Sequence, residues 1–311
     1  MQGKWWIAAL MLLAALTSSA AGQQNQLQTD SLKADSINRA AADPDFVKVW
    51  LVTVTPGNST TSVFGHAALR LQCASENLDY CFSFGTEDDG IDFFKFVSGS
   101  TKGGFQSMPT SSFISNYKKE GRGVSQLQLN LLPREEQELW RLLDHEVEQG
   151  PHWNYNFITT SCTSMCIWAV EQCLDKEHIE YQNLDPILSA TYAEVMHSIS
   201  AHAPWQELLI NLRFFQHRQE TGDLNEKFSP EMLMSSWQKA LLTDSMGFSR
   251  SMTVGLLQTL CKADPKQAVT APLLTPLRVL LLLFLLVVIT TIYFKKRNMM
   301  RIQMITLYQK I

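Results

Sequence analysis

Two side chains far apart in the sequence could act together in nucleophilic chemistry. His66 opens a largely apolar segment, His66–Leu71, that is expected to form a strand. Cys162 follows the polar turn Asn154–Ser161 and precedes an apolar stretch with helical spacing. A thiol in the first turn of a helix, with an imidazole nearby, is how proteins make a thiolate nucleophile near neutral pH. We therefore predict that Cys162 is the nucleophile and that His66 is its base.

The expected chemistry is attack on the carbonyl carbon of an ester or amide. The positive end of the helix and an adjacent imidazolium should lower the pKa of the Cys162 thiol, so that the thiolate attacks and a thioester forms. His66 would take the thiol proton and return it to the leaving group. A third polar group commonly orients the imidazole, and Ser83, on the segment expected to pair with that of His66, is the candidate. The backbone N–H of Cys162 and a neighbouring polar side chain would stabilise the oxyanion.

Two other arrangements of the same residue types stay open. His152 lies ten residues before Cys162 and could be the base in place of His66. His66, Cys162 and Cys166 could ligate zinc, but the sequence offers no convincing fourth ligand. We therefore expect neither a metal nor another cofactor.

The six cysteines permit disulfides in an oxidising compartment. Cys73 and Cys81 flank a short turn between two expected strands and could cross-link that hairpin. Cys162, Cys166 and Cys173 are spaced by four and seven residues, which puts them on one helical face. If all six were paired, Cys162 would be structural rather than catalytic.

The beginning of the chain has the features of a secretory signal peptide over residues 1–22. Lys4 supplies the positive charge, Trp5–Leu16 is the apolar region, and small residues around Ala21 fit a cleavage site. Residues 23–45 are polar and rich in Gln, Ser and Ala, which predicts a disordered linker.

The end of the chain carries a second apolar run over residues 273–297. Its uncharged part, Val279–Phe294, is long enough to cross a bilayer once its apolar neighbours are included. The basic residues that follow are Lys295, Lys296, Arg297 and Arg301. Such residues directly after a span are typical of a cytoplasmic flank. We therefore predict one transmembrane helix, a cytoplasmic tail over 298–311, and a periplasmic or outside location for the region before the helix.

The order of the patterns predicts an α+β fold with a small antiparallel sheet. Expected strands cover residues 47–55, 63–72, 80–84 and 123–131, and helical patterns after that of Cys162 cover 186–201, 204–217, 230–242 and 248–261. Strands dominate the first half and helices the second, unlike the alternation of a doubly wound sheet. We expect a Cys/His domain over 46–200 and a helical extension over 201–272. The net charge of −4, without a basic stripe, disfavours nucleic-acid binding.

Several of these residues resemble the Lnb N-terminal periplasmic domain family, over roughly residues 47–175. The matching segments are Thr53-Val54-Thr55-Pro56-Gly57, Ser62-Val63-Phe64-Gly65-His66-Ala67-Ala68-Leu69-Arg70, Phe84-Gly85-Thr86, and Tyr155-Asn156-Phe157 leading to Cys162-Thr163. Arg122, Val124 and Gln126, before a Leu-x-Leu strand, resemble the middle block of the family. The chain departs from the family pattern at Ser161 and Ser83, where an Asn is usual.

The resemblance implies a fold similar to permuted papain-like enzymes of the NlpC and lecithin:retinol acyltransferase type. It implies that His66 and Cys162 are base and nucleophile, and that the reaction is acyl transfer. A phospholipid would donate an acyl chain to Cys162, and the N-terminal amine of a lipoprotein at the membrane surface would accept it. Membrane anchoring fits these substrates, because tethering raises their effective concentration.

Two other functions stay open. The chain could be an NlpC-type cysteine amidase or peptidase of the cell envelope, or a disulfide-stabilised ectodomain that binds a partner without catalysis. The redox state of Cys162 separates enzyme from binder, because a disulfide would remove the nucleophile.

Overall fold

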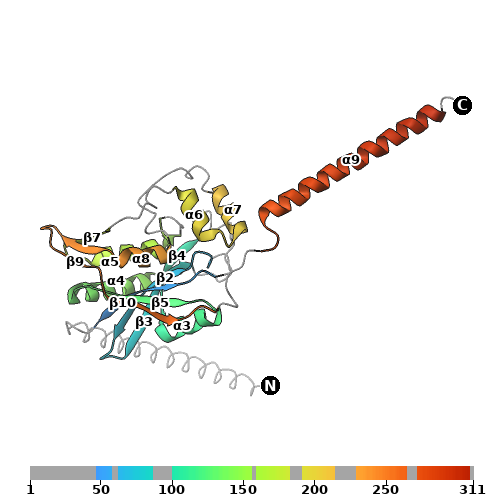
Figure 1. Ribbon diagram of the computed structural model, residues 1–311. Helices are drawn as coiled ribbons and strands as arrows, with labels where there is room; N and C mark the ends of the chain where they lie inside the picture. The colour runs from blue at the N-terminus through green and yellow to red at the C-terminus, as the bar shows by residue number, and fades with distance from the viewer. Residues whose placement is uncertain are drawn as a thin grey trace, which may run out of the picture.

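The computed structural model describes residues 47–57, 62–86, 100–155, 159–182, 191–213, 229–264 and 272–308. These residues form an antiparallel sheet with helices packed against it, and a long helix that projects from the domain (Figure 1). The predicted α+β class with one C-terminal apolar helix is confirmed. The expected signal peptide and linker lie outside the described residues.

The main sheet has seven strands in the order β10-β5-β1-β2-β3-β4-β6, and each neighbouring pair is antiparallel. The strands are β1 (Lys48–Val54), β2 (His66–Cys73), β3 (Leu78–Thr86), β4 (Lys102–Pro109), β5 (Val124–Leu129), β6 (Trp153–Asn154) and β10 (Thr253–Cys261). The strands expected from the sequence are therefore present, and β2, which starts at His66, lies in the middle of the sheet.

The central strand β1 shows why both faces of the sheet are covered. Its sequence is apolar at consecutive positions instead of alternating, and all four residues of the stretch Val49–Val52 are buried. A strand of this kind needs apolar packing on both sides. The register pairs Val54 of β1 with His66 of β2 and with Val124 of β5. The end of β1 therefore lies beside the starts of β2 and β5, at one end of these three neighbouring strands.

Different helices cover the two faces. The helices α4 (Pro133–Gln149), α5 (Cys162–Cys173) and α8 (Pro230–Trp237) pack on one side, which we call the α5 face, and α3 (Thr110–Lys119) packs on the other, the α3 face (Figure 1). Successive strand residues point to opposite faces. Accordingly Ala67 of β2 belongs to the core on the α5 face, whereas Ala68 belongs to the core on the α3 face.

The helix expected over residues 248–261 is wrong. That segment forms β9 (Ser249–Ser251) and β10, and β10 pairs with the otherwise free edge of β5. Gly255 has a φ of 77°, in the left-handed region, close to a shift in the β10–β5 register. An interior glycine and β-branched neighbours such as Thr253 favour an irregular strand over a helix.

The region after residue 200 is helical only in part. The helices α6 (Tyr192–Ser200), α7 (Pro204–Arg213) and α8 lie within three expected helical patterns and are shorter than predicted. A second sheet combines β7 (Glu177–Glu180), β8 (Leu241–Asp244) and β9 in the order β7-β8-β9. This region therefore contributes strands to both sheets and is integrated with the domain.

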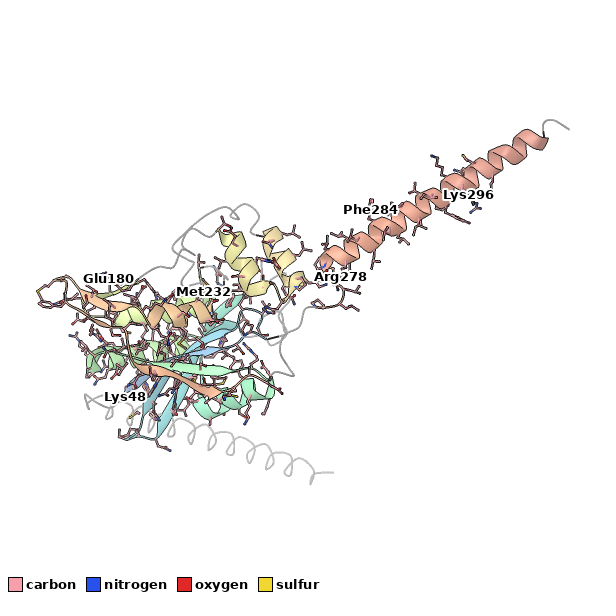
Figure 2. The ribbon with its side chains drawn as sticks, viewed as in Figure 1. Lys48, Glu180, Met232, Arg278, Phe284 and Lys296 are labelled. Atoms are coloured by element: carbon pink, nitrogen blue, oxygen red, sulfur yellow. The ribbon has the colours of Figure 1, made fainter. Side chains whose placement is uncertain are left out.

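The long helix α9 (Pro276–Tyr308) contains the one candidate membrane span among the described residues, Pro276–Met300, with a mean hydropathy of 2.6 and no burial against the protein. Figure 2 shows Arg278 at the end nearest the domain, Phe284 in the apolar part and Lys296 beyond it. The side chain of Arg278 turns back and donates to the carbonyl of Leu273 at 2.6 Å. This placement keeps its charge at the end of the apolar run.

Candidate active site

The N-terminus of α5 is fixed by a reciprocal serine cap. Oγ of Ser161 accepts from the backbone N–H of Ser164 at 3.3 Å, and Oγ of Ser164 accepts from the backbone N–H of Ser161 at 2.8 Å. Serine is as good an N-cap as asparagine. This position is where asparagine is usual in the pattern described above, so the cap function survives the departure.

The sulfur of Cys162 sits at this N-terminus, pressed against β2. The residue is 8% exposed. Sγ receives hydrogen bonds from the backbone N–H groups of Ala67, Cys162 and Thr163, and the Thr163 hydroxyl lies 3.9 Å away. These donors favour the thiolate, but desolvation by burial outweighs them and raises the pKa of Cys162. The expectation of a lowered thiol pKa is therefore wrong for this state, in which the thiol keeps its proton at neutral pH.

His66 is placed by a sharp turn at the start of β2. Gly65 has a φ of 84°, and a Cβ there would lie 2.6 Å from the carbonyl oxygen of Val54, so glycine is required. The imidazole packs against the rings of Phe113 and Tyr117 of α3, with centroids 6.3 and 6.1 Å away. Burial and the charge of Arg122 lower the pKa of His66 from 6.5 to about 4, although part of the residue remains accessible. The imidazole is thus neutral at neutral pH and can accept a proton.

The two candidates lie at the start of β2 but on opposite faces of the sheet, because Cys162 packs with Ala67 on the α5 face and His66 packs against α3. The sulfur is bonded to the backbone of Ala67, the residue next to His66. Burial raises the pKa of Tyr117. The charge of Arg122 opposes this shift, and the thiolate form of Cys162 would add to it. Cys162 therefore lies near the ring that packs on His66. No hydrogen bond between described atoms joins the imidazole to the sulfur. Both groups are therefore neutral, and no contact between described atoms makes them an ion pair.

The other candidates from the sequence occupy different environments. Ser83 pairs with Ala68 and so lies on the strand beside β2, on the α3 face like His66, but no described hydrogen bond connects it to the imidazole. Its orienting role stays a prediction. His152 interacts with Glu146, at 3.6 Å, and with the carbonyl of Gly150, so it belongs to the end of α4.

Arg122 lies close to His66, although the sequence predicted no catalytic or binding role for it. Its guanidinium lies over the ring of Tyr117, 4.7 Å from the centroid. Nε donates to the carbonyl of Thr55 at 2.8 Å, and Nη1 donates to Glu120 at 3.0 Å. The residue is 6% exposed, and within the part of the chain that the structure describes Nη2 has no hydrogen-bond partner. We call this group of residues, Thr55, His66, Tyr117 and Arg122, the strand-end corner.

Tyr155 borders the sulfur from the other side. It is buried and stacks on Phe84 with ring centroids 5.9 Å apart. Burial raises the pKa of Tyr155 strongly, and the thiolate form of Cys162 would add to the shift. Its phenol therefore keeps its proton and can donate a hydrogen bond near Cys162.

A chain of contacts connects the His66 turn with the membrane helix. The ring of His202, between α6 and α7, bonds to the backbone of Val63. Three residues further on, Nε1 of Trp205 donates to the carbonyl of Leu274 at 2.8 Å, just before α9. Figure 1 shows α6 and α7 beside the start of α9. The site therefore lies on the side of the domain that adjoins the apolar helix.

All six cysteines are free thiols. Cys73 lies in the core of the α5 face and Cys81 in that of the α3 face, so the hairpin cross-link between them is wrong. Strand alternation is the reason, because the two residues point to opposite sides of the sheet. Cys162, Cys166 and Cys173 share the buried face of α5, as their spacing predicts. Cys162 is therefore not held in a disulfide.

The described part of the chain is thus an α+β domain that holds a cysteine at a helix N-terminus beside a histidine strand. A family model, the Lnb N-terminal periplasmic domain, matches residues 33–197, more than half of the 311 residues. The chain belongs to this family, and it combines that periplasmic domain with an apolar helix that could anchor it in a membrane. Searches of curated proteins and of solved structures found no match.

Some site residues had no usable sequence signal. Tyr155 and Arg122 occur in segments that resemble the family, yet nothing in their spacing connects them to Cys162 or His66. Their proximity depends on how the ends of β1, β2 and β5 converge, which only the register of the sheet decides. Glycine at position 65, directly before His66, is the local feature that could have marked this turn.

Proposed function

We propose that this chain is a membrane-tethered thiol acyltransferase. It would move an acyl chain from a phospholipid to the N-terminal amine of a lipoprotein through a thioester on Cys162. One observation carries the proposal: Sγ of Cys162 lies at a capped helix N-terminus, bonded to the backbone N–H of Ala67 beside a neutral His66. That arrangement suits a general-base mechanism, in which proton transfer accompanies attack.

In the first half-reaction the sulfur attacks the ester carbonyl of the phospholipid. The C–S bond forms while His66 takes the thiol proton. The ester C–O bond then breaks, and His66 returns the proton to the departing lysophospholipid hydroxyl. The backbone N–H of Cys162 and the phenol of Tyr155 are the candidate donors to the oxyanion. Tyr155 fits the role because burial keeps its phenol protonated and because it lies near the sulfur of Cys162.

In the second half-reaction the amine of the lipoprotein attacks the thioester. The new N–C bond forms and the C–S bond breaks. His66 takes a proton from the attacking amine and delivers it to the leaving sulfur, which regenerates the free thiol. No external oxidant, reductant or cofactor is needed for either half-reaction.

The burial of the sulfur favours transfer over hydrolysis. Cys162 and Tyr155 are each 8% exposed, so bulk water has little access to a thioester formed there. Water exclusion protects a reactive acyl intermediate until the correct acceptor arrives. This observation supports an acyltransferase rather than an amidase or peptidase, which must admit water to the same intermediate.

The membrane side of the domain supports lipid substrates. His202 and Trp205 link the His66 turn to the chain just before α9, so the site stays next to the anchor. The basic residues Lys295–Arg297 after the apolar run support a cytoplasmic C-terminus, with the catalytic domain on the other side.

The test is complementation in cells that lack lipoprotein N-acylation. Mass spectrometry of a reporter lipoprotein should detect a triacylated N-terminus with the wild-type chain and a diacylated one with Cys162→Ala or His66→Ala. Arg134→Gln is the matched control, because its exposed ion pair with Asp175 is remote from catalysis. Folded wild-type protein that yields no triacylated reporter would contradict the proposal. Peptide cleavage dependent on Cys162 would favour the amidase instead.

A further inference from the structure

One donor in the strand-end corner has no partner among the described residues. Arg122 uses Nε for the carbonyl of Thr55 and Nη1 for Glu120, but Nη2 is buried and no described atom accepts a hydrogen bond from it. The side chain is 6% exposed, so water has little access to it. Leaving a buried polar donor unpaired costs about 1–3 kcal/mol, and more when the group is charged. An unpaired donor in a guanidinium whose other nitrogens are hydrogen-bonded requires an explanation.

The surroundings of the unpaired Nη2 of Arg122 indicate which molecule it could bind. Arg122 and His66 both pack on the ring of Tyr117, with the guanidinium carbon 4.7 Å and the imidazole 6.1 Å from its centroid. On the other side of β2, Sγ of Cys162 bonds to the backbone of Ala67. The free N–H therefore lies in the same corner as the proposed base, and the proposed nucleophile lies across β2 from it.

The chemistry of the donor defines the ligand class. A guanidinium binds oxyanions strongly, and phosphate oxygens are among its preferred partners. A carboxylate already lies nearby on Glu120, but it bonds to Nη1 and is itself 53% exposed. The remaining N–H suits one further anionic oxygen that arrives with the substrate.

We propose that Arg122 recognises the phosphodiester of the acyl donor, with Nη2 donating to a non-bridging phosphate oxygen of a glycerophospholipid. This inference rests on the proposed acyltransferase function. In such a lipid the phosphate and the acyl esters are carried by one glycerol unit. A phosphate held at Arg122 would therefore direct an ester carbonyl toward Cys162, whereas diacylglycerol, which lacks the phosphate, would not be held.

Phosphate binding would also assist the base. The charge of Arg122 disfavours protonation of His66, in addition to the larger effect of burial. An anion seated on the guanidinium compensates that charge, which makes the imidazole a better proton acceptor when the donor lipid is in place. Arg122 is thus a specificity residue for the lipid and a positioning residue for its ester.

The experiment compares two donors with the purified full-length protein in maltoside micelles. Dipalmitoyl phosphatidylglycerol and dipalmitoylglycerol carry the same acyl chains, and only the first has a phosphate. Thioester at Cys162 is followed by intact-protein mass spectrometry and hydroxylamine release. We expect the phospholipid to acylate Cys162 about 10-fold or more faster, as a charge-assisted hydrogen bond implies. Arg122→Lys keeps the charge without the forked donors and should bring the phospholipid rate close to that of diacylglycerol.

Arg70→Lys is the matched control, since Arg70 is a partly buried arginine that also lies over an aromatic ring, Trp50, but all three of its nitrogens are hydrogen-bonded. It should keep the donor ratio of the wild type. Equal acylation by both donors in the wild type overturns the inference and leaves the acyltransferase function intact, whether or not the Arg122 variant folds. If inorganic phosphate rescues acylation by diacylglycerol, the site takes free phosphate and the headgroup proposal fails. Absence of thioester with either donor overturns both proposals.

Discussion

Arg70 in β2 and Arg122 just before β5 both lie over aromatic rings, but only Arg70 has a described partner for every guanidinium nitrogen. Arg70 donates from Nε and Nη2 to Asp79 and from Nη1 to Gln126, at 2.6–2.7 Å. Gln126 in turn donates to Gln258 of β10, and Thr110 donates to Asp79. Arg122 keeps one N–H unbound beside His66. The Arg70 network is complete within the fold, whereas the donor left over in the strand-end corner is the one that we propose binds a substrate.

The largest expected effect separates the two regions by activity. His66→Ala should lower the rate of Cys162 acylation about 10²–10⁴-fold, the usual contribution of a positioned general base. The midpoint of thermal unfolding should change little, because the ring packs at the edge of the α3 face. Acylation kinetics and thermal unfolding of the purified protein measure the two effects. A variant that loses stability but keeps its rate would assign His66 to the fold instead.

The second prediction tests the Arg70 network by stability. Arg70→Met leaves the partly exposed Asp79 without its cation and should lower the free energy of unfolding by about 2–4 kcal/mol. The ratio of rates with phospholipid and diacylglycerol should stay that of the wild type. The double variant Arg70→Met/Asp79→Leu should recover part of the loss, because the unpaired carboxylate is removed. Chemical denaturation of the full-length protein in detergent provides the measurement.

The third prediction concerns acid and the strand-end corner. The pKa of His66 is about 4 in the folded protein and 6.5 when unfolded. Above pH 6.5 both states are neutral there, and between pH 6.5 and 4 only the unfolded state binds the proton. As the pH is lowered from 6.5 to 4, the free energy of unfolding should therefore fall by up to about 3 kcal/mol because of His66. His66→Gln should lack this part of the pH dependence, and the difference between the two denaturation series isolates it. Identical slopes would show that the imidazole is not desolvated.

The smallest expected effect concerns the cap below the sulfur. Ser161→Ala removes the side chain that accepts from the N–H of Ser164 and should cost about 1 kcal/mol of stability. Ser161→Asn restores an acceptor and should recover most of it, since both residues are good N-caps. Thermal unfolding of the three proteins tests the series. Equal midpoints would mean that the cap contributes nothing to the placement of Cys162.

The strands were predictable because their chemistry is local. Val47–Thr55 is rich in β-branched residues, and Gly123–Leu131 alternates cleanly, so both patterns identify strands without tertiary information. The segment after Gly247 was misjudged as helical because β10 is stabilised by the edge of β5, more than a hundred residues earlier in the chain. Pairing across such a distance leaves no periodic trace in the sequence.

The candidate site was predictable in type but not in electrostatics. A histidine at the start of a strand and a cysteine in the first turn of a helix were predicted from the sequence, and the structure places both residues in those positions. The helix N-terminus suggested a lowered thiol pKa, yet burial reverses the sign for Cys162. The depth of a side chain depends on how α5 packs on the sheet, and desolvation at that depth exceeds the effect of three backbone N–H groups.

The place of β10 in the sheet has a consequence for biogenesis. β10 ends at Cys261 and α9 starts at Pro276, so the last strand of the sheet leaves the ribosome shortly before the apolar helix does. Until then the edge of β5, and Gln126 within it, lack their partner strand. If α9 anchors the protein as proposed, the sheet can close only when nearly all of the chain before the anchor has been exported, and folding and anchoring would then finish nearly together.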